Sequence, residues 1–248
     1  MADDERAYPD PTSGIFVSHL YRYVWSLPYV FDKVVLDAGC GSGYGAELLA
    51  TIAKRVAAVD YDPDVIARNR SVYASRSNLT FDVMDVSQLA FATGAFDVIV
   101  SLEVFEHLES SRSEAYLREL HRVCHDGGTV ILSTPNRLVE KPHLKSAGVV
   151  YHYHVNSVSP AELKRAASKH FSRVEIYGQR PVERPVKRVL KWLDVFNLRH
   201  HLLAYGTKNQ LDVMLSGGVR SWGPDLRRLE IGRSLRRQSS TIVAVCTK

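Results

Sequence analysis

Four glycines at alternate positions follow an apolar run that ends in an aspartate. The segment VVLDAGCGSGYGAELLA (Val34–Ala50) contains Gly39, Gly41, Gly43 and Gly45. Turns of this kind bring backbone N–H groups close to a ligand, and the run from Gly41 to Ala46 satisfies the G-x-G-x-x-A fingerprint of dinucleotide-binding proteins. The glycines alone leave two ligands open, a nicotinamide dinucleotide and S-adenosylmethionine.

Asp37, two residues before the first glycine, favours the second ligand. A dinucleotide would place its pyrophosphate on this turn, where the carboxylate would repel it. S-adenosylmethionine brings an ammonium and a sulfonium, which an acidic turn suits. Asp60 and Asp85 end two further strand-like runs. The spacing of Asp60 does not discriminate, because dinucleotide enzymes also carry an acid about 20 residues after the turn.

Two segments hold histidines that could transfer a proton or bind a metal. Glu103-x-x-Glu106-His107 follows a strand-like run, and YHYHVNSVSPAEL (Tyr151–Leu163) contains His152 and His154. In an extended chain these two histidines share one face. Imidazole titrates near neutral pH, so each could accept a proton. Packing of the loop without a catalytic role is the alternative for both.

Strand-like and helix-like runs alternate from residue 33 to residue 136. Strands are predicted at 33–39, 55–62, 78–85, 95–103 and 128–136, and helices at 44–53, 63–74 and 113–125. The last helix is expected to stop at Gly127-Gly128. Such alternation predicts an open parallel sheet with helices on both faces, and ligands bind at the carboxyl ends of its strands.

The two ends of the chain add a helix and two strands. A helix over residues 15–30 should end near Pro28, and Ser159, Pro160 and Glu162 form a helix start with a capping box. Strands are expected at 172–179 and 240–248. The intervening residues 180–238 are too many for a simple connection and contain an amphipathic helical pattern. We expect this insertion to pack as a lid or a homodimer face, with membrane-surface attachment as an alternative.

These features together resemble the class I S-adenosylmethionine-dependent methyltransferases, whose first motif is D/E-x-G-x-G-x-G. The resemblance runs from about residue 34 to 136, with weaker matches to Gln179 and in the last strand. It implies a Rossmann-like α/β fold: a seven-stranded, mostly parallel sheet with helices on both faces, an antiparallel last strand and a helical insertion before that strand. It also implies one domain over 1–248, with an N-terminal lid helix (1–29), a cofactor-binding core (30–179), a basic insertion (180–238) and a last strand (239–248).

The resemblance also implies which residues contact the cofactor. Asp60 would accept both ribose hydroxyls, Asp85 would take the exocyclic amine of adenine, and FDVIVSLEVFEHL (Phe96–Leu108) resembles the family's fourth strand and the loop beneath the methyl donor. Arg22 could clamp the cofactor's carboxylate, and a surface position is the alternative for it. The expected cofactor contacts are Arg22, Asp37, Gly39, Cys40, Gly41, Gly43, Asp60, Tyr61, Met84, Asp85, Val86, Ser101 and Glu103.

For the histidines the resemblance is to small-molecule O-methyltransferases. His154-Val155 precedes an S-P-x-E-L helix start, which makes His154 the first candidate for general base, His152 the second and His107 the third. The family's usual acid after this pair is Asn156 here, so a carboxylate-assisted base lacks support. The E-x-x-E-H stretch is similar to that of ubiquinone-biosynthesis O-methyltransferases, where such side chains can hold a divalent cation. A structural role for this stretch is favoured over a metal.

Composition limits the class of protein and its partners. The chain of 248 residues has a net charge of +5, and residues 180–237 hold 13 lysines and arginines against 5 acids. A basic segment suits an anionic acceptor, but a solvated arginine-rich surface is the favoured alternative. Three scattered cysteines and no apolar h-region suggest a cytoplasmic protein without a transmembrane segment.

The sequence therefore predicts methyl transfer to a hydroxyl of a small-molecule acceptor, a sugar, glycan or phenolic metabolite, with S-adenosylhomocysteine as product. A nucleic-acid methyltransferase is less favoured, because the N-P-P-Y-type motif is absent and the fourth strand runs into Ser101-Leu102-Glu103-Val104. The sequence also leaves open a protein methyltransferase, a non-catalytic S-adenosylmethionine-binding protein and, with less support, an NAD-dependent oxidoreductase.

Overall fold

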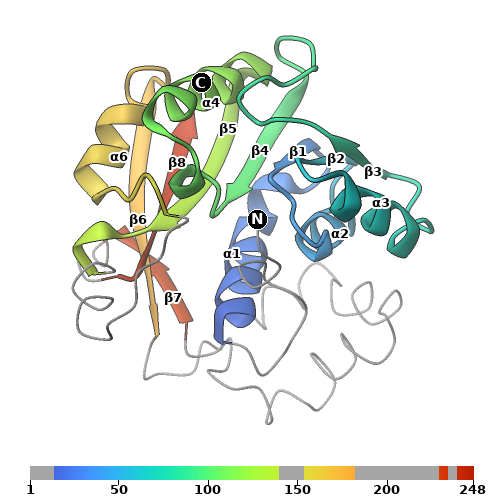
Figure 1. Cartoon of the computed structure of the whole chain (residues 1–248), viewed down its shortest axis with the longest axis horizontal. Helices are drawn as coiled ribbons and strands as arrows, with labels where there is room; N and C mark the ends of the chain where they lie inside the picture. The colour runs from blue at the N-terminus through green and yellow to red at the C-terminus, as the bar shows by residue number, and fades with distance from the viewer. Residues whose placement is uncertain (1–13, 140–153, 182–228, 234–238) are drawn as a thin grey trace.

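The computed structural model describes residues 14–139, 154–181, 229–233 and 239–248 (Figure 1). The strands are β1 (Val34–Ala38), β2 (Arg55–Asp60), β3 (Leu79–Val83), β4 (Phe96–Leu102), β5 (Cys124–Pro135), β6 (Arg173–Pro181), β7 (Leu229–Gly232) and β8 (Thr241–Thr247). The helices are α1 (Gly14–Val30), α2 (Tyr44–Ala50), α3 (Pro63–Val72), α4 (Ser110–Val123) and α6 (Pro160–Ala167), with a 3-10 turn, η2, at Phe105–His107.

The described strands form one mixed sheet in the order β3-β2-β1-β4-β5-β8-β6-β7. Pairing is parallel from β3 to β5, and β8 lies antiparallel between β5 and β6. The predicted α/β class and antiparallel last strand are confirmed. Chain order reverses between β1 and β4, so their carboxyl ends open a crevice where ligands of such sheets bind.

The sheet has one strand more than the seven predicted. β7 pairs antiparallel with the end of β6, which runs on to Pro181. Its four residues are too short for a strand pattern to stand out in the sequence, and only the free edge of β6 gives them a partner. They belong to segment 180–238, for which the sequence predicts a helical insertion. Residues 182–228 and 234–238, with the amphipathic helical pattern, lie outside the described residues.

Helices cover both faces of the sheet because neighbouring strand residues point in opposite directions. On β1, Val35 packs in a core with α1 and α2, while Leu36 packs in a second core with α4 and α6. Figure 1 shows α1 beside the middle of the sheet, close to the ends of β1 and β4. None of the helices in the described part of the chain is long and apolar enough to cross a membrane.

One predicted helix end is confirmed and one was wrong. α1 ends at Val30, near Pro28 as predicted; Leu27 and Val30 are both fully buried, so packing holds the last turn although proline donates no hydrogen bond. The helix predicted to stop at Gly127-Gly128 ends at Val123. β5 begins at once at the buried Cys124, and a register shift between β4 and β5 accommodates the glycines.

The start of α6 agrees with its sequence signature. The hydroxyl of Ser159 accepts from the backbone N–H of Glu162, whose carboxylate in turn accepts from the backbone N–H of Ser159. This capping box fixes the direction in which the preceding loop, with His154, enters the helix.

Candidate active site

The glycine turn lies at the carboxyl end of β1, as predicted. Gly39, Gly41 and Gly43 have φ values of 83°, 50° and 81°, a region that residues with a side chain rarely adopt. A Cβ on Gly39 would lie 2.4 Å from Cγ2 of Val104, so the turn packs directly against the loop after β4. The N–H groups of Gly39 and Cys40 donate to one carbonyl of β2, at 2.8 and 2.9 Å. These two hydrogen bonds tie the start of the turn to the end of β2.

Asp37 lies beneath this turn, fully buried against α1. The hydroxyl of Tyr23 lies 3.2 and 3.3 Å from its two carboxylate oxygens and donates to them. Burial raises the pKa of Asp37 to about 7; the Tyr23 hydrogen bond opposes this rise and the charge of Asp60 adds to it. Tyr23 can reach Asp37 because Gly45 has no side chain, since a Cβ there would lie 2.0 Å from the tyrosine ring.

Asp60, at the end of β2, is held in place by two backbone N–H groups. One oxygen accepts from Gly41 at 3.0 Å and the other from Asp62 at 3.1 Å. Each carboxylate oxygen can accept more than one hydrogen bond, so both retain capacity for a ligand hydroxyl. Tyr61 follows directly and is 49% exposed. This arrangement suits the predicted contact with a ribose.

Met84, Asp85 and Val86 follow the end of β3, and the acid among them already has partners. The carboxylate of Asp85 accepts from the N–H and the hydroxyl of Ser87 and pairs with Arg112. Burial raises the pKa of Asp85, but the Ser87 hydrogen bonds and the Arg112 charge outweigh burial and hold it below its usual value. If Asp85 also accepts from the adenine amine, the amine and Arg112 would share one carboxylate.

Ser101 lies on β4 and Glu103 directly follows its last residue, and the two side chains have different surroundings. Ser101 is fully buried; its hydroxyl donates to the carbonyl of Ala38 at 2.6 Å and accepts from Tyr116 at 2.8 Å. These bonds fasten the end of β1 to β4 and to α4. Glu103 has a φ of 55°, unusual outside glycine, and its carboxylate accepts from the hydroxyl of Ser133 at 2.6 Å. The chain turns sharply here, toward the glycine turn.

Arg22 is buried, with 2% of its surface exposed, and reaches this region from α1. Its Nη1 donates to Oε1 of Gln179 on β6 at 2.6 Å, and its Nη2 lies 3.7 Å from Glu103. The amide of Gln179 donates to the carbonyl of Ser18 at 3.0 Å. Nε of Arg22 has no hydrogen-bond partner among the described residues. A surface position for Arg22, the alternative left open by the sequence, is wrong.

The sequence prediction missed two residues of this site, Tyr23 and Gln179. Tyr23 lies 14 positions before its partner Asp37, and Gln179 lies 157 positions after Arg22. No local motif marks either residue, because each joins the site only through the packing of α1 against the sheet. The histidines could be identified as candidates from their residue type alone, but the residue types of Tyr23 and Gln179 gave no such indication.

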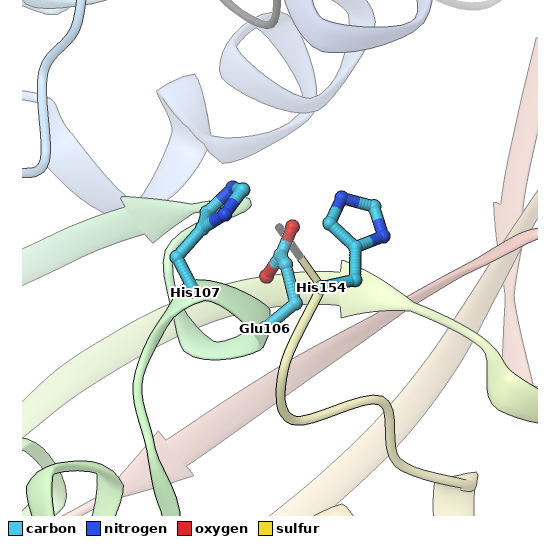
Figure 2. A group of neighbouring side chains, drawn as sticks. All are labelled: Glu106, His107 and His154. Carbon is cyan, nitrogen blue, oxygen red and sulfur yellow. The ribbon is translucent and has the colours of Figure 1, made fainter. Parts of the chain in front are cut away.

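Glu106, His107 and His154 meet beside the loop after β4 (Figure 2). Each offers one ligand atom, and these atoms all lie within 4.8 Å of one another. The rings of His107 and His154 are 5.3 Å apart in an edge-to-face arrangement. The N–H of Asn156 donates to the carbonyl of Glu106 at 3.0 Å and ties the two segments together. His152 lies outside the described residues.

Glu106 is the buried member of this group, with 1% of its surface exposed. Burial raises its pKa well above its usual value, and the nearby charge of Glu103 adds to the rise. One of its carboxylate oxygens, Oε2, has no hydrogen-bond partner among the described residues. The 3-10 geometry of η2, in place of a regular α-helix, lets the adjacent Glu106 and His107 approach the same point.

The sheet order, the glycine turn and the acids at consecutive strand ends define a nucleotide-binding α/β protein of the Rossmann-like type. A model of the methyltransferase domain family matches residues 36–132. A protein of Mycobacterium tuberculosis named as a probable S-adenosylmethionine-dependent methyltransferase is 37% identical over 142 residues, which are 56% of this chain and 49% of that protein. The chain thus spans about half the length of that relative.

Two further comparisons extend this similarity. The ubiquinone biosynthesis O-methyltransferase of Thiobacillus denitrificans is 30% identical over 157 residues, 59% of this chain and 67% of that enzyme. The YcgJ protein of Bacillus subtilis has the same fold, with a TM-score of 0.59 at 16% identity over 94% of this chain and 98% of that structure. The chain belongs to the class I S-adenosylmethionine-dependent methyltransferases, and S-adenosylmethionine is the cofactor.

Proposed function

We propose that this chain transfers the methyl group of S-adenosylmethionine to a hydroxyl of a small-molecule acceptor, with His154 as the proton acceptor. The observation that carries the proposal is the position of His154. It faces His107 and Glu106 beside the loop that packs against the cofactor's glycine turn. A hydroxyl must lose its proton as the new bond forms, and an imidazole with a pKa near neutrality is suited to accept it.

The acidic and basic side chains around the turn support the cofactor's half of this proposal. Asp37 would face the positive end of the cofactor and Asp60 its ribose hydroxyls, while the buried Arg22 would pair with its carboxylate. Methyl transfer from a sulfonium is an in-line displacement, so the chain's main task is to align donor and acceptor. Such alignment can contribute up to roughly 7–11 kcal/mol.

Exposed apolar side chains beyond β5 support a sugar, glycan or phenolic acceptor. The N–H of Arg137 donates to the carbonyl of Val158 at 3.0 Å and joins the two segments beyond β5. These segments expose Leu138 (52%) and Val155 (58%), and apolar side chains of this kind suit the face of a ring. The name of the Thiobacillus relative, an O-methyltransferase, favours oxygen as the methylated atom.

Cofactor binding and methyl transfer can be tested in turn. S-adenosylhomocysteine should raise the melting temperature of the protein and NADH should not; a shift with NADH alone would contradict the proposal. Transfer should then be measured by mass spectrometry with sugars, glycans and phenols in EDTA, with RNA and protein as competing acceptor classes. Binding of the cofactor without transfer to any acceptor would favour a non-catalytic protein.

The role of His154 has its own variants. His154→Ala should lower turnover at least a hundredfold and leave the affinity for S-adenosylhomocysteine unchanged, because general-base catalysis contributes about 10²–10⁴-fold. His125→Ala is the matched control. His125 is an exposed histidine at the start of β5 and is not one of the three residues that meet at the candidate site. Unchanged turnover in His154→Ala would remove His154 as the proton acceptor.

A further inference from the structure

We propose that Glu106, His107 and His154 form a binding site for one divalent transition-metal ion of the Zn²⁺ type. The ligand atoms of the three side chains lie within 4.8 Å of one another, and Figure 2 shows the two rings on either side of the carboxylate of Glu106. The group joins two separate segments, the turn after β4 and the loop before α6. Two adjacent residues and one 47 positions later supply it.

The distances allow an ion to enter with small movements. An ion held tetrahedrally at about 2.0–2.1 Å from each ligand places the ligand atoms about 3.3 Å apart. The side chains here would have to close by at most about 1.5 Å, the difference from 4.8 Å. Rotation of the two half-buried histidine rings can provide that movement, while the buried Glu106 stays in place.

The burial of Glu106 points independently to a ligand. Its Oε2 lacks a hydrogen-bond partner in the described part of the chain, although only 1% of the residue is exposed. A buried acceptor without a partner costs about 1–3 kcal/mol, and more when it carries a charge. A cation beside this oxygen would remove that cost and offset the repulsion from Glu103.

The donor set indicates the class of ion. Two imidazoles and one carboxylate match the ligands of catalytic zinc sites, which keep a fourth position open for water or substrate. Mg²⁺ and Ca²⁺ prefer oxygen ligands, and this group offers them only one carboxylate. We therefore expect selectivity for Zn²⁺ or Co²⁺ over Mg²⁺.

Occupancy of the site would control the chemistry proposed above, and this consequence rests on the proposed function. An ion and a proton compete for the lone pair of the ligating nitrogen of His154. The metal-bound form would lack its proton acceptor. Zn²⁺ should therefore inhibit methyl transfer in proportion to the filling of this site.

Metal binding can be measured without any acceptor. The EDTA-treated protein should bind one Zn²⁺ per chain by isothermal titration calorimetry, and Co²⁺ should give the visible absorption of a four-coordinate site. Glu106→Gln and His154→Ala should each weaken binding at least tenfold, with His125→Ala as the control. Glu106→Gln keeps the shape of a buried side chain, and S-adenosylhomocysteine binding would verify the fold of each variant. Zn²⁺ affinity that is absent, or equal in wild type and variants, would overturn the site.

Measurements of methyl transfer then distinguish a failure of the metal site from a failure of the proposed function. Transfer by the EDTA-treated protein, decreasing as Zn²⁺ fills the site, would support both. Transfer that requires Zn²⁺ would overturn His154 as the proton acceptor and support the metal site. Full transfer at Zn²⁺ concentrations that saturate the site would overturn the inhibition.

Discussion

Asp37→Asn should separate the stability of the fold from its cofactor binding. Asp37 is fully buried beneath the glycine turn, and burial raises its pKa to about 7 from an ordinary value of 3.8. Between these two pKa values the folded protein therefore holds a proton on Asp37 that the unfolded chain has already released. Stability falls as pH rises through the range, because the folded state must desolvate the carboxylate or keep it protonated.

The size of the effect follows from the two pKa values. At about 1.4 kcal/mol per pH unit, the shift from 3.8 to about 7 costs the cofactor-free fold about 4 kcal/mol above pH 7. Roughly 2–3 kcal/mol of that should be lost between pH 5 and pH 8. Asparagine cannot ionise, so the variant lacks this loss. Its buried amide adds a cost that is the same at both pH values, and comparing the pH dependence cancels it.

Urea denaturation of wild type and Asp37→Asn at pH 5 and pH 8 measures this directly. Wild type should lose roughly 2–3 kcal/mol more than the variant, and other titrating groups cancel between the two proteins. Calorimetry with S-adenosylhomocysteine should show that the variant binds far more weakly at pH 8, since it lacks the carboxylate for the ammonium. Equal pH dependence of the two proteins, or equal cofactor affinity, would refute the reasoning.

Two further predictions concern the glycine turn and α6. Gly39→Ala should abolish S-adenosylhomocysteine binding, because its Cβ would lie 2.4 Å from Val104; Gly127→Ala is the matched control, with a similar φ of 78° and open space around its Cβ. Binding that survives in Gly39→Ala would contradict the close packing of the turn. Ser159→Ala should lower the free energy of unfolding by about 1 kcal/mol, since the capping box with Glu162 is lost. An unchanged urea midpoint would show that the cap contributes nothing.

Most of the fold could be predicted because its signals are local. Alternating apolar runs, the glycines after β1 and the Ser159 cap each lie within a few residues, and each marks one element. The errors fell where packing overrides a local signal. The helix before β5 did not run to Gly127-Gly128, because the buried Cys124 already pairs with β4. β7 could not be predicted either, because its pairing depends on the extended edge of β6.

The candidate site divides in the same way. The sequence by itself determined the glycine turn, the acids at the strand ends and the histidines, because the type and spacing of each residue indicate its chemistry. The tertiary structure decided which of them meet. Tyr23 reaches Asp37, and Gln179 orients Arg22, only because α1 packs across the sheet. His154 joins Glu106 and His107 only because the loop before α6 returns to the end of β4. Contacts between residues so far apart along the chain form only when the chain folds, so a local sequence pattern cannot predict them.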